Sequence, residues 1–253
     1  MTANGRSALV TGGAGGIGQA IAGSLAQAGY RVYLLDLSER VVEVARTLSA
    51  QPGQVQGRIV DVADEAQLVT AARWCLQQAG GACDVLVNCA GISPKGEGGP
   101  IPLPEITTEQ WERVHRINVT APFILCRELM PSMAQQGFGR VVNIVSRAAR
   151  TYVPVSGLDY HSSKTALLGL TRALAGAYGE KGVTVNSVAP GRIATAMARA
   201  THPDLLADTL KMIPVGRFGE PAEIGGLVVF LASEAASYIN GACIDINGGI
   251  YMT

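Results

Sequence analysis

The chain has 253 residues, and 20 Lys and Arg residues balance 20 Asp and Glu residues, so its formal net charge is zero. This balance gives no attraction to nucleic acid or to an anionic membrane, and the longest apolar runs are too short to span a bilayer. The length suits one domain with a substantial core.

The five cysteines are scattered, their number is odd, and none forms a CxxC pair. The first residues contain no basic segment followed by an apolar stretch, so no signal peptide is visible. These features are typical of a reduced, cytoplasmic protein. The three histidines show no metal-ligand spacing, and we expect no metal site.

Short apolar runs alternate with helical patterns along the whole chain. We expect strands at 7–10, 31–36, 55–60, 84–88, 141–146, 183–188 and 242–246, and helices at 19–28, 64–79, 108–136, 159–181 and 220–232. This alternation predicts a doubly wound parallel sheet in a three-layer α/β/α arrangement. No linker or repeat divides residues 1–253, which we interpret as a single domain. Ligands in such folds bind beyond the carboxyl ends of the strands.

A glycine-rich turn follows the first predicted strand directly. It is Thr11-Gly12-Gly13-Ala14-Gly15-Gly16-Ile17-Gly18, and the helix after it ends at Gly29. Glycines let the backbone turn tightly and approach a pyrophosphate at a helix N-terminus. A glycine run alone is a weak signal, but this run lies between a strand and a helix, as the dinucleotide-binding fingerprint requires.

The second predicted strand ends in a carboxylate, Asp36. A carboxylate at this point accepts hydrogen bonds from adenosine ribose hydroxyls, and it repels a 2′-phosphate by roughly 1 to 4 kcal/mol. Leu37 and Ser38 follow, so no adjacent cation would hold that phosphate, and we expect Arg40 to face solvent. We therefore expect NAD as the cofactor rather than NADP. The alternative is that Asp36 caps the following helix.

Tyr160 and Lys164 are four positions apart, and therefore lie on one face of a predicted helix. The pKa of free Tyr lies about 3 units above neutral pH, a gap worth roughly 4 kcal/mol. An unperturbed phenol is therefore poorly suited to acid or base chemistry at neutral pH. A nearby ammonium group lowers the pKa of a phenol, and the hydroxyl of Ser146 could hold a carbonyl oxygen beside it. Such a pair alone is more often a solvated helix face, but with the dinucleotide fingerprint it predicts a proton-transfer site. His161 points about 100° away from Tyr160, so we expect it beside this site or exposed.

The order of these motifs resembles the short-chain dehydrogenase/reductase family over nearly the whole chain. Thr11 to Gly18 resembles the family's cofactor loop, and Asp61-Val62 resembles its adenine contact. Asn88-Cys89-Ala90-Gly91 resembles its Asn-Asn-Ala-Gly motif, and Pro190-Gly191-Arg192-Ile193-Ala194-Thr195 resembles its nicotinamide contact. Four residues match its catalytic tetrad: Asn118, Ser146, Tyr160 and Lys164.

The resemblance implies a Rossmann-like fold and an NAD-dependent oxidoreductase. It implies that Tyr160 is the acid or base, that Lys164 lowers its pKa and binds the nicotinamide ribose, and that Ser146 positions the substrate oxygen. Asn118 would hold a water that links Lys164 to solvent. The implied cofactor-binding residues are Gly12, Gly15, Gly16, Ile17, Gly18, Asp36, Asp61, Val62, Asn88, Ala90, Gly91, Tyr160, Lys164, Pro190, Gly191, Ile193 and Thr195.

The sequence departs from the family pattern in three places. Tyr160 follows Ser146 by 14 positions, one more than expected, so we expect the loop between them to bulge. Cys89 replaces the second Asn of Asn-Asn-Ala-Gly, and Asn247 stands where many members have Asp before two glycines. Only the longer loop bears on the substrate wall.

We expect the substrate pocket to be walled by residues 92–104, 147–158 and 192–213, with the last segment acting as a lid. The favoured substrate is a secondary alcohol, such as a polyol or sugar alcohol, or the corresponding ketone. One alternative is a 3-oxoacyl-thioester reductase or 3-hydroxyacyl dehydrogenase. An alternative of another class is a regulatory module that binds nucleotide without turnover.

The predicted helix 159–181 carries many small residues, which allow another helix to approach closely. Packing against the sheet of the same chain is one explanation. The resemblance instead favours subunit contacts through helices 108–136 and 159–181, in a homotetramer or a homodimer. The apolar end of segment 241–253 would suit a second interface.

Overall fold

A seven-stranded parallel sheet forms the centre of the protein. We describe it from a computed structural model, which covers residues 5–51, 53–97, 99–195 and 208–252. The strand order is β3-β2-β1-β4-β5-β6-β7. The strands are β1 (Ser7–Thr11), β2 (Arg31–Asp36), β3 (Val55–Ile59), β4 (Val85–Asn88), β5 (Gly139–Ile144), β6 (Val183–Pro190) and β7 (Cys243–Ile246). The chain runs outward from β1 to β3 and then crosses to β4, which creates a switch point between β1 and β4.

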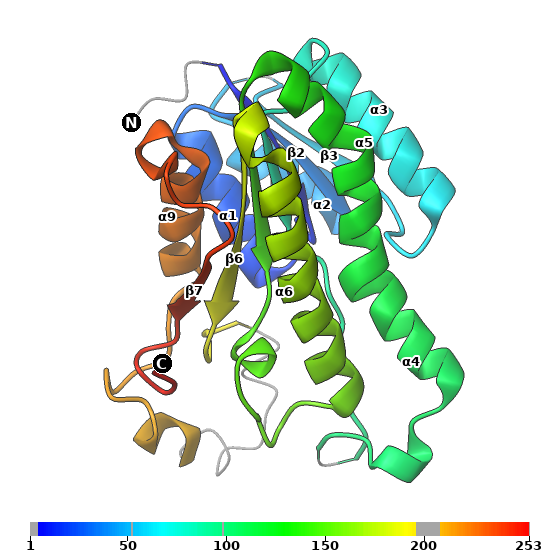
Figure 1. The fold of residues 1–253 in the computed structure, drawn as a ribbon, viewed down its shortest axis with the longest axis vertical. Helices are drawn as coiled ribbons and strands as arrows, with labels where there is room; N and C mark the ends of the chain where they lie inside the picture. Colours follow the sequence, from blue (N-terminus) through cyan, green and yellow to red (C-terminus); the bar gives the residue numbers. More distant parts are fainter. Residues whose placement is uncertain (1–4, 52, 98, 196–207, 253) are drawn as a thin grey trace.

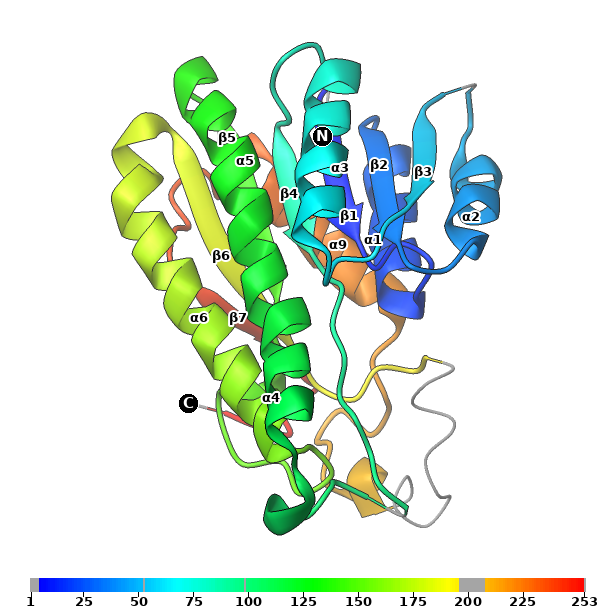
Figure 2. The ribbon, with the colours of Figure 1, turned by 90° about the vertical axis from the view of Figure 1, so that its right-hand side faces the viewer.

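Helices cover both faces of this sheet (Figure 1). The α-helices are α1 (Gly16–Gln27), α2 (Arg40–Leu48), α3 (Glu65–Ala79), α4 (Thr108–His115), α5 (Ala121–Gln136), α6 (Leu158–Tyr178) and α9 (Pro221–Ala232). Short helical turns are η1 (Leu103–Glu105), η2 (Arg116–Thr120), η3 (Arg147–Ala149), η4 (Gly179–Lys181) and η5 (Glu234–Ala236). Helices α3, α5 and α6 lie in front of the sheet in Figure 2, and α1 and α9 lie behind it. The predicted three-layer, doubly wound parallel sheet is confirmed.

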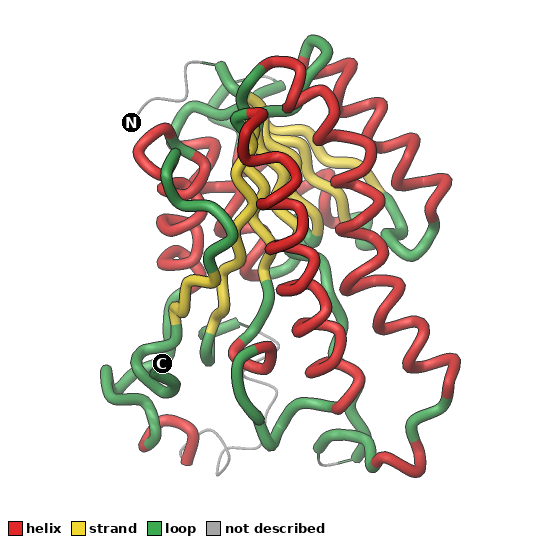
Figure 3. The backbone as a smooth tube through the Cα atoms, in the orientation of Figure 1, coloured by secondary structure: helices red, strands yellow, loops and turns green. Residues whose placement is uncertain are grey.

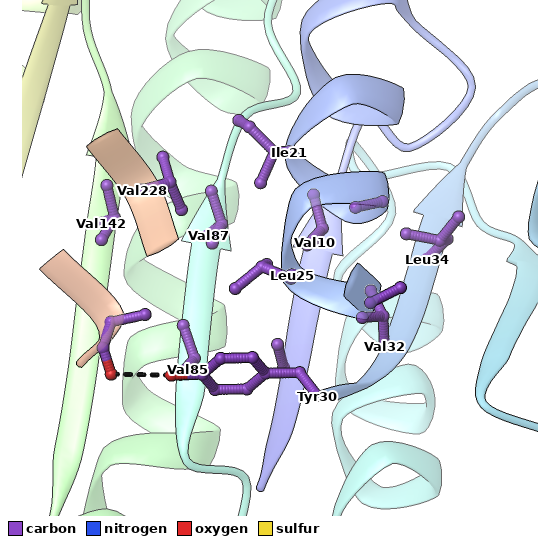
Figure 4. Close-up of a cluster of buried hydrophobic side chains, with 14 of the residues drawn as sticks. Val10, Ile21, Leu25, Tyr30, Val32, Leu34, Val85, Val87, Val142 and Val228 are labelled. Carbon is purple, nitrogen blue, oxygen red and sulfur yellow. Dashed lines mark hydrogen bonds between the residues drawn. The ribbon is translucent and has the colours of Figure 1, made fainter. Parts of the chain in front are cut away.

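The central strands β1, β4, β5 and β6 are buried on both faces, which explains why they read as largely apolar runs in the sequence. On one face, Leu25 of α1 and Val228 of α9 face Val87 and its neighbours (Figure 4). The phenol of Tyr30 donates a hydrogen bond of 3.0 Å to the carbonyl oxygen of Ala232, so the end of α9 is tied to the start of β2. Each such buried apolar side chain contributes about 1.5–3 kcal/mol.

Most predicted boundaries differ from the observed ones by one or two residues, as is usual at frayed ends. The first helix begins at Gly16 rather than at residue 19, because the last glycines of the turn already form its first turn. Strand β5 ends at Ile144, two residues before the predicted end. Helix α6 ends at Tyr178, and residues 179–181 form the tighter turn η4.

The predicted helix 108–136 is interrupted by a wide π-helical turn at Arg116–Thr120. Pro122 explains the interruption, because it has no N–H to donate to the carbonyl group four residues earlier. That earlier residue is Asn118, whose side chain points into the molecule and is fully buried. Wide turns of this kind often occur at functional sites.

Several connecting segments gather beyond the carboxyl ends of β4 to β7, in the lower part of Figure 3. They include most of the predicted substrate walls, with helix α4 beside them (Figure 1). Of the predicted lid, residues 196–207 lie outside the described residues. In the described part of the chain, no helix has the length and apolar character needed to cross a bilayer.

Candidate active site

The predicted site residues come together at the carboxyl edge of the sheet. Asp36, Asn88 and Pro190 are the last residues of β2, β4 and β6. Asp61 and Ser146 lie two positions beyond β3 and β5. Because all strands are parallel, these five residues share one edge although they are far apart in sequence.

The glycine turn leaves a bare helix N-terminus at this edge. Helix α1 starts at Gly16, and no side chain caps its first N–H groups. A Cβ atom at Gly18 would collide with the carbonyl oxygen of Gly12, and one at Gly12 would lie 3.0 Å from the backbone of Ala90. Gly12 also has φ +72°, which favours glycine. The open N–H groups fit a pyrophosphate, as the fingerprint predicts.

Thr11 joins the two halves of the sheet at this point. Its hydroxyl oxygen accepts the backbone N–H groups of Cys89 and Ala90, both at 3.0 Å. The end of β1 is thereby fixed against the segment that follows β4. Cys89 packs against the apolar core, and burial raises the pKa of its thiol to about 12. An apolar neighbour suits this position as well as a second Asn would.

Asp36 holds the glycine turn in place. Its carboxylate accepts the backbone N–H of Ala14 and that of Ser38, each at 2.9 Å. Helix α2 begins later, at Arg40, with Glu39 in the cap position, so the alternative that Asp36 caps this helix is wrong. Each carboxylate oxygen retains a lone pair that a ribose hydroxyl could use.

Two of the four predicted catalytic residues, Lys164 and Asn118, lie beside Gly91, and Tyr160 and Ser146 lie near Lys164 and near each other. A Cβ atom at Gly91 would be 3.1 Å from Lys164 Nζ and 3.2 Å from Asn118 Oδ1. Lys164 Nζ lies 5.8 Å from the centroid of the Tyr160 ring, and the Ser146 side chain is near enough to the Tyr160 phenol to act on its pKa. Lys164 also donates to the carbonyl oxygen of Ile144 at 2.9 Å.

Asn118 is held by three hydrogen bonds. Its Oδ1 accepts the N–H of Ile92 at 2.9 Å, and its Nδ2 donates to the carbonyl oxygen of Ile92 and to Ser163 Oγ, both at 3.0 Å. These bonds link the wide turn η2 to the segment after β4 and to α6. The side chain is therefore fixed, rather than being an ordinary solvated helix Asn.

The pKa of Tyr160 differs from the expectation drawn from the sequence. Burial raises the pKa of its phenol, and this outweighs the hydrogen bond from Ser146, which lowers it. Burial also lowers the pKa of Lys164, to about 8. The sequence predicted a lowered Tyr160 pKa, because it showed the ammonium group but not the burial of both side chains.

Asn88 belongs to a buried polar network as well as to the predicted cofactor residues. Its Nδ2 donates to Asn143 Oδ1 at 2.8 Å, and Asn143 donates to Thr171 Oγ1 at 2.9 Å. Thr171 bonds to Ser187 Oγ at 2.8 Å. The network crosses β4, β5, α6 and β6. The sequence analysis missed Asn143, although a lone polar residue in an apolar strand was a signal for it.

The segment after β6 closes over the glycine turn. A Cβ atom at Gly16 would lie 3.2 Å from the Thr195 methyl group, so Thr195 covers the start of α1. Gly191 packs so closely on Asn247 that a Cβ atom there would be 2.8 Å away. Asn247 donates from Nδ2 to the carbonyl oxygen of Tyr251 at 2.9 Å, which the Asp found in many relatives could not do.

The remaining predicted residues lie around the same edge. The Asp61 carboxylate accepts the N–H of Ala63 at 2.9 Å in the turn before α3, and Val62 packs on the core beside it. Ile193 is buried and bridges to Gly219. In the substrate walls, Lys95 donates to the carbonyl oxygen of Val155, and burial lowers its pKa. Among the described residues, no group of three or more His, Cys, Asp or Glu side chains is placed to hold a metal ion.

Comparison with known proteins places this arrangement in a family. Residues 12–251 match the family model described as enoyl-(acyl carrier protein) reductase. The chain is 37% identical over 248 residues to D-threitol dehydrogenase of Mycolicibacterium smegmatis, covering 97% of this chain and 93% of that protein. It is 40% identical over 247 residues to 2-(R)-hydroxypropyl-CoM dehydrogenase of Xanthobacter autotrophicus, covering 96% and 97%.

A solved structure gives the same result. The crystal structure of a 3-oxoacyl-[acyl-carrier protein] reductase with bound NAD from Brucella melitensis superposes with a TM-score of 0.88 and 35% sequence identity, covering 98% of this chain and 92% of that chain. A doubly wound sheet with a glycine turn and a Ser-Tyr-Lys group at one edge defines a nicotinamide-dependent oxidoreductase. The chain belongs to the short-chain dehydrogenase/reductase family, and it acts on CH–OH groups.

Proposed function

We propose that the protein is a dehydrogenase that prefers NAD and acts on a secondary alcohol, with a polyol or sugar alcohol as the favoured substrate. The observation that carries the proposal is the position of the Ser146 side chain and of Lys164 beside the Tyr160 phenol. A phenol beside a serine hydroxyl can exchange a proton with a substrate oxygen held between the two. The relative named as a D-threitol dehydrogenase supports the choice of a polyol.

The residues then have separate roles. Tyr160 accepts the hydroxyl proton in oxidation and returns it in reduction, and Ser146 orients the substrate oxygen. Lys164 lies between the phenol and Asn118, where it can bind a ribose hydroxyl and pass a proton toward solvent. When bound, the nicotinamide ring supplies the hydride acceptor for an alcohol or the hydride donor for a ketone.

The proposed cofactor site extends from Asp36 to Thr195. The pyrophosphate would lie on the N-terminus of α1, and the adenosine ribose would lie beside Asp36. Asp61, Val62 and the Asn88 to Gly91 segment would complete the adenosine side. The stretch from Pro190 to Thr195 would contact the nicotinamide. Repulsion between the Asp36 carboxylate and a 2′-phosphate favours NAD over NADP.

The test is nicotinamide absorbance with purified protein, NAD or NADP, and a panel of polyols, other secondary alcohols and 3-hydroxyacyl thioesters. We expect turnover with NAD and a polyol, and loss of that turnover in Tyr160→Phe. Tight NAD binding without turnover on any of these substrates would instead support a regulatory module. Turnover that survives in Tyr160→Phe would contradict the assignment of the acid or base.

A second candidate is a 3-oxoacyl-thioester reductase or 3-hydroxyacyl dehydrogenase. It is favoured by the solved relative that is named as a 3-oxoacyl reductase and has NAD bound, because a protein with that name then binds the cofactor that Asp36 is expected to favour. The thioester arm of the substrate panel separates the two candidates. A higher kcat/KM for the 3-hydroxyacyl thioester than for any polyol would favour the second.

We also propose that the protein acts in the cytoplasm as a homotetramer, or as a homodimer. The five cysteines of the described chain are all free thiols, which suits a reducing compartment. Phe123 of α5 and Trp111 of α4 are partly exposed, and α6 presents Gly169 and Ala166 to solvent, so apolar and small residues are available for contact between subunits. Sedimentation of the purified protein would measure the assembly, and a monomer would contradict it.

A further inference from the structure

His161 touches the loop between Ser146 and Tyr160 at two separate points. Its Nδ1 lies 2.9 Å from the carbonyl oxygen of Ala148. Its Nε2 lies 3.3 Å from the backbone nitrogen and 3.2 Å from the carbonyl oxygen of Val153. The ring of Tyr152 stacks on the imidazole, with centroids 5.8 Å apart and planes inclined by 14°. His161 is therefore the main attachment of this loop to α6.

Ala148 connects His161 to the catalytic serine. The N–H of Ala148 donates to Ser146 Oγ at 3.1 Å, and its carbonyl oxygen bonds to the imidazole. The Ser146 side chain in turn lies beside the phenol of Tyr160 and acts on its pKa. Since Tyr160 and His161 are consecutive on α6, the same helix turn that carries the phenol also holds the segment that carries Ser146.

The chemistry of imidazole fits both contacts at once. A neutral imidazole has one N–H donor and one acceptor nitrogen. With the proton on Nδ1, the imidazole donates to the carbonyl oxygen of Ala148 and Nε2 accepts the N–H of Val153. With the proton on Nε2, it would donate to the carbonyl oxygen of Val153 instead, so either tautomer bonds to the loop. Ala148 and Val153 are 3% and 6% exposed, so their backbone groups would be costly to leave without hydrogen bonds.

We propose that His161 is a positioning residue, which fixes the Ser146 hydroxyl toward Tyr160 by holding Ala148 and Val153. The proposal rests on the proposed roles of Ser146 and Tyr160. The N–H of Ala148 occupies one lone pair of Ser146 Oγ, and this sets the direction in which the serine proton points. The connection from Ser146 to Tyr160 spans 14 positions, and the bonds of His161 tie it to α6 near its start, at Ala148, and again at Val153.

The first test is His161→Phe, which keeps a flat ring against Tyr152 and removes both hydrogen bonds. We expect kcat to fall about 10- to 100-fold, as for a catalytic group that is displaced by about 1 Å. The Kd for NAD should not change, because the hydrogen bonds of the imidazole go to Ala148 and Val153 and not to the glycine turn. Thr165→Val is the matched control: it removes a hydroxyl that bonds the His161 carbonyl oxygen at 2.9 Å and leaves the ring contacts intact. It should keep the wild-type kcat.

The second test asks whether His161 acts through Ser146. In Ser146→Ala the hydroxyl is absent, so adding His161→Phe should cause little further loss of kcat. If the two losses multiply in the double variant, His161 does not work through the serine, and the proposal is overturned. Normal activity of His161→Phe alone, with Ser146→Ala impaired, would overturn it while leaving the proposed function intact.

A third measurement needs no substrate. Amide hydrogen exchange at Val153 reads the attachment of the loop directly, because this N–H donates to Nε2. In His161→Phe we expect faster exchange at Val153 and unchanged exchange at Val142 in β5. Equal protection of Val153 in both proteins would overturn the proposal even if no substrate were found.

Discussion

Lys164 donates a hydrogen bond of 2.9 Å to the carbonyl oxygen of Ile144, the last residue of β5. The bond ties the first half of α6 to the strand that leads to Ser146. The ammonium group is therefore held in a buried position, and burial lowers its pKa to about 8. A group that we propose as part of the catalytic site is in this way a source of instability.

Lys164→Met should make the protein more stable and inactive. The folded chain holds the Lys164 proton less tightly than the unfolded chain, whose lysine titrates near 10.5, and a shift of this size corresponds to about 3 kcal/mol. The penalty is complete below about pH 8 and disappears as the pH rises toward 10.5. Met removes it, and the loss of the bond to Ile144 offsets part of the gain. Urea unfolding at several pH values would show a higher free energy of unfolding for the variant than for wild type at pH 7, and the difference would shrink above pH 8. A variant that is less stable at pH 7 would contradict this account.

Tyr160→Phe should lose most of the turnover and keep cofactor binding. Loss of a general acid or base costs about 10² to 10⁴ in rate. The phenyl ring fills the same space, and the glycine turn and Asp36 do not depend on the hydroxyl. The measurements are kcat in steady state and the Kd for NAD from fluorescence. A parallel loss of NAD affinity would mean that the hydroxyl serves binding rather than proton transfer.

The two reaction directions should respond to pH with opposite signs. Burial raises the pKa of Tyr160 above its usual value near 10, so the phenol form dominates at neutral pH. Oxidation needs the phenolate form of Tyr160 to accept the substrate proton, so its rate should rise through the alkaline range as the phenol ionises. Reduction needs the phenol to donate, and its rate should fall over the same range. Profiles of log kcat in both directions would reveal this, and an oxidation optimum below pH 7 would be inconsistent with it.

Asp36→Asn should shift the cofactor preference toward NADP. Removing a repulsion of roughly 1 to 4 kcal/mol would change the ratio of kcat/KM for the two cofactors by at least about fivefold. Asn can still accept an N–H from Ala14 or Ser38, so the glycine turn should remain ordered. Glu39→Gln, which removes an exposed charge from the same turn, is the control and should leave the ratio unchanged. An equal ratio in wild type and Asp36→Asn would remove Asp36 as the selecting residue.

Gly18→Ala should disrupt the cofactor turn. The added methyl group would collide with the backbone oxygen of Gly12, which cannot yield as a flexible side chain can. We expect a loss of about 1–3 kcal/mol in unfolding free energy and a weaker Kd for NAD. Gly226→Ala, in the interior of α9 with no atom near the added methyl group, should instead stabilise by about 0.5–1 kcal/mol. Equal effects of the two substitutions would show that the close contact in the turn is unimportant.

The fold was predictable because its signals are local and repeated. The central strands read as apolar runs, since parallel strands are buried on both faces, and the predicted catalytic and cofactor residues follow the strands at their carboxyl ends. The order of the motifs therefore located the edge where Asp36, Asn88 and Pro190 meet.

The sequence analysis failed where an effect depends on burial or on contacts between distant residues. It could not show that the phenol of Tyr160 and the ammonium group of Lys164 are both desolvated, and so it predicted the wrong direction for the pKa of the phenol. The wide turn at Asn118 was not predicted, because the helix was inferred from the spacing of apolar residues, and Pro122 does not alter that spacing. The two contacts of His161 involve backbone atoms, which no side-chain pattern records.

Helix α6 carries Tyr160, His161, Ser163 and Lys164 within little more than one turn. Ser163 holds Asn118, His161 holds the Ser146 loop, and Lys164 holds the end of β5. Any rotation of this helix about its axis would move all of these contacts together. The positions of these side chains are therefore coupled to one another rather than independent. Substitutions far along α6 that change how it lies on the sheet should therefore alter the rate of reaction while leaving every functional side chain in the sequence.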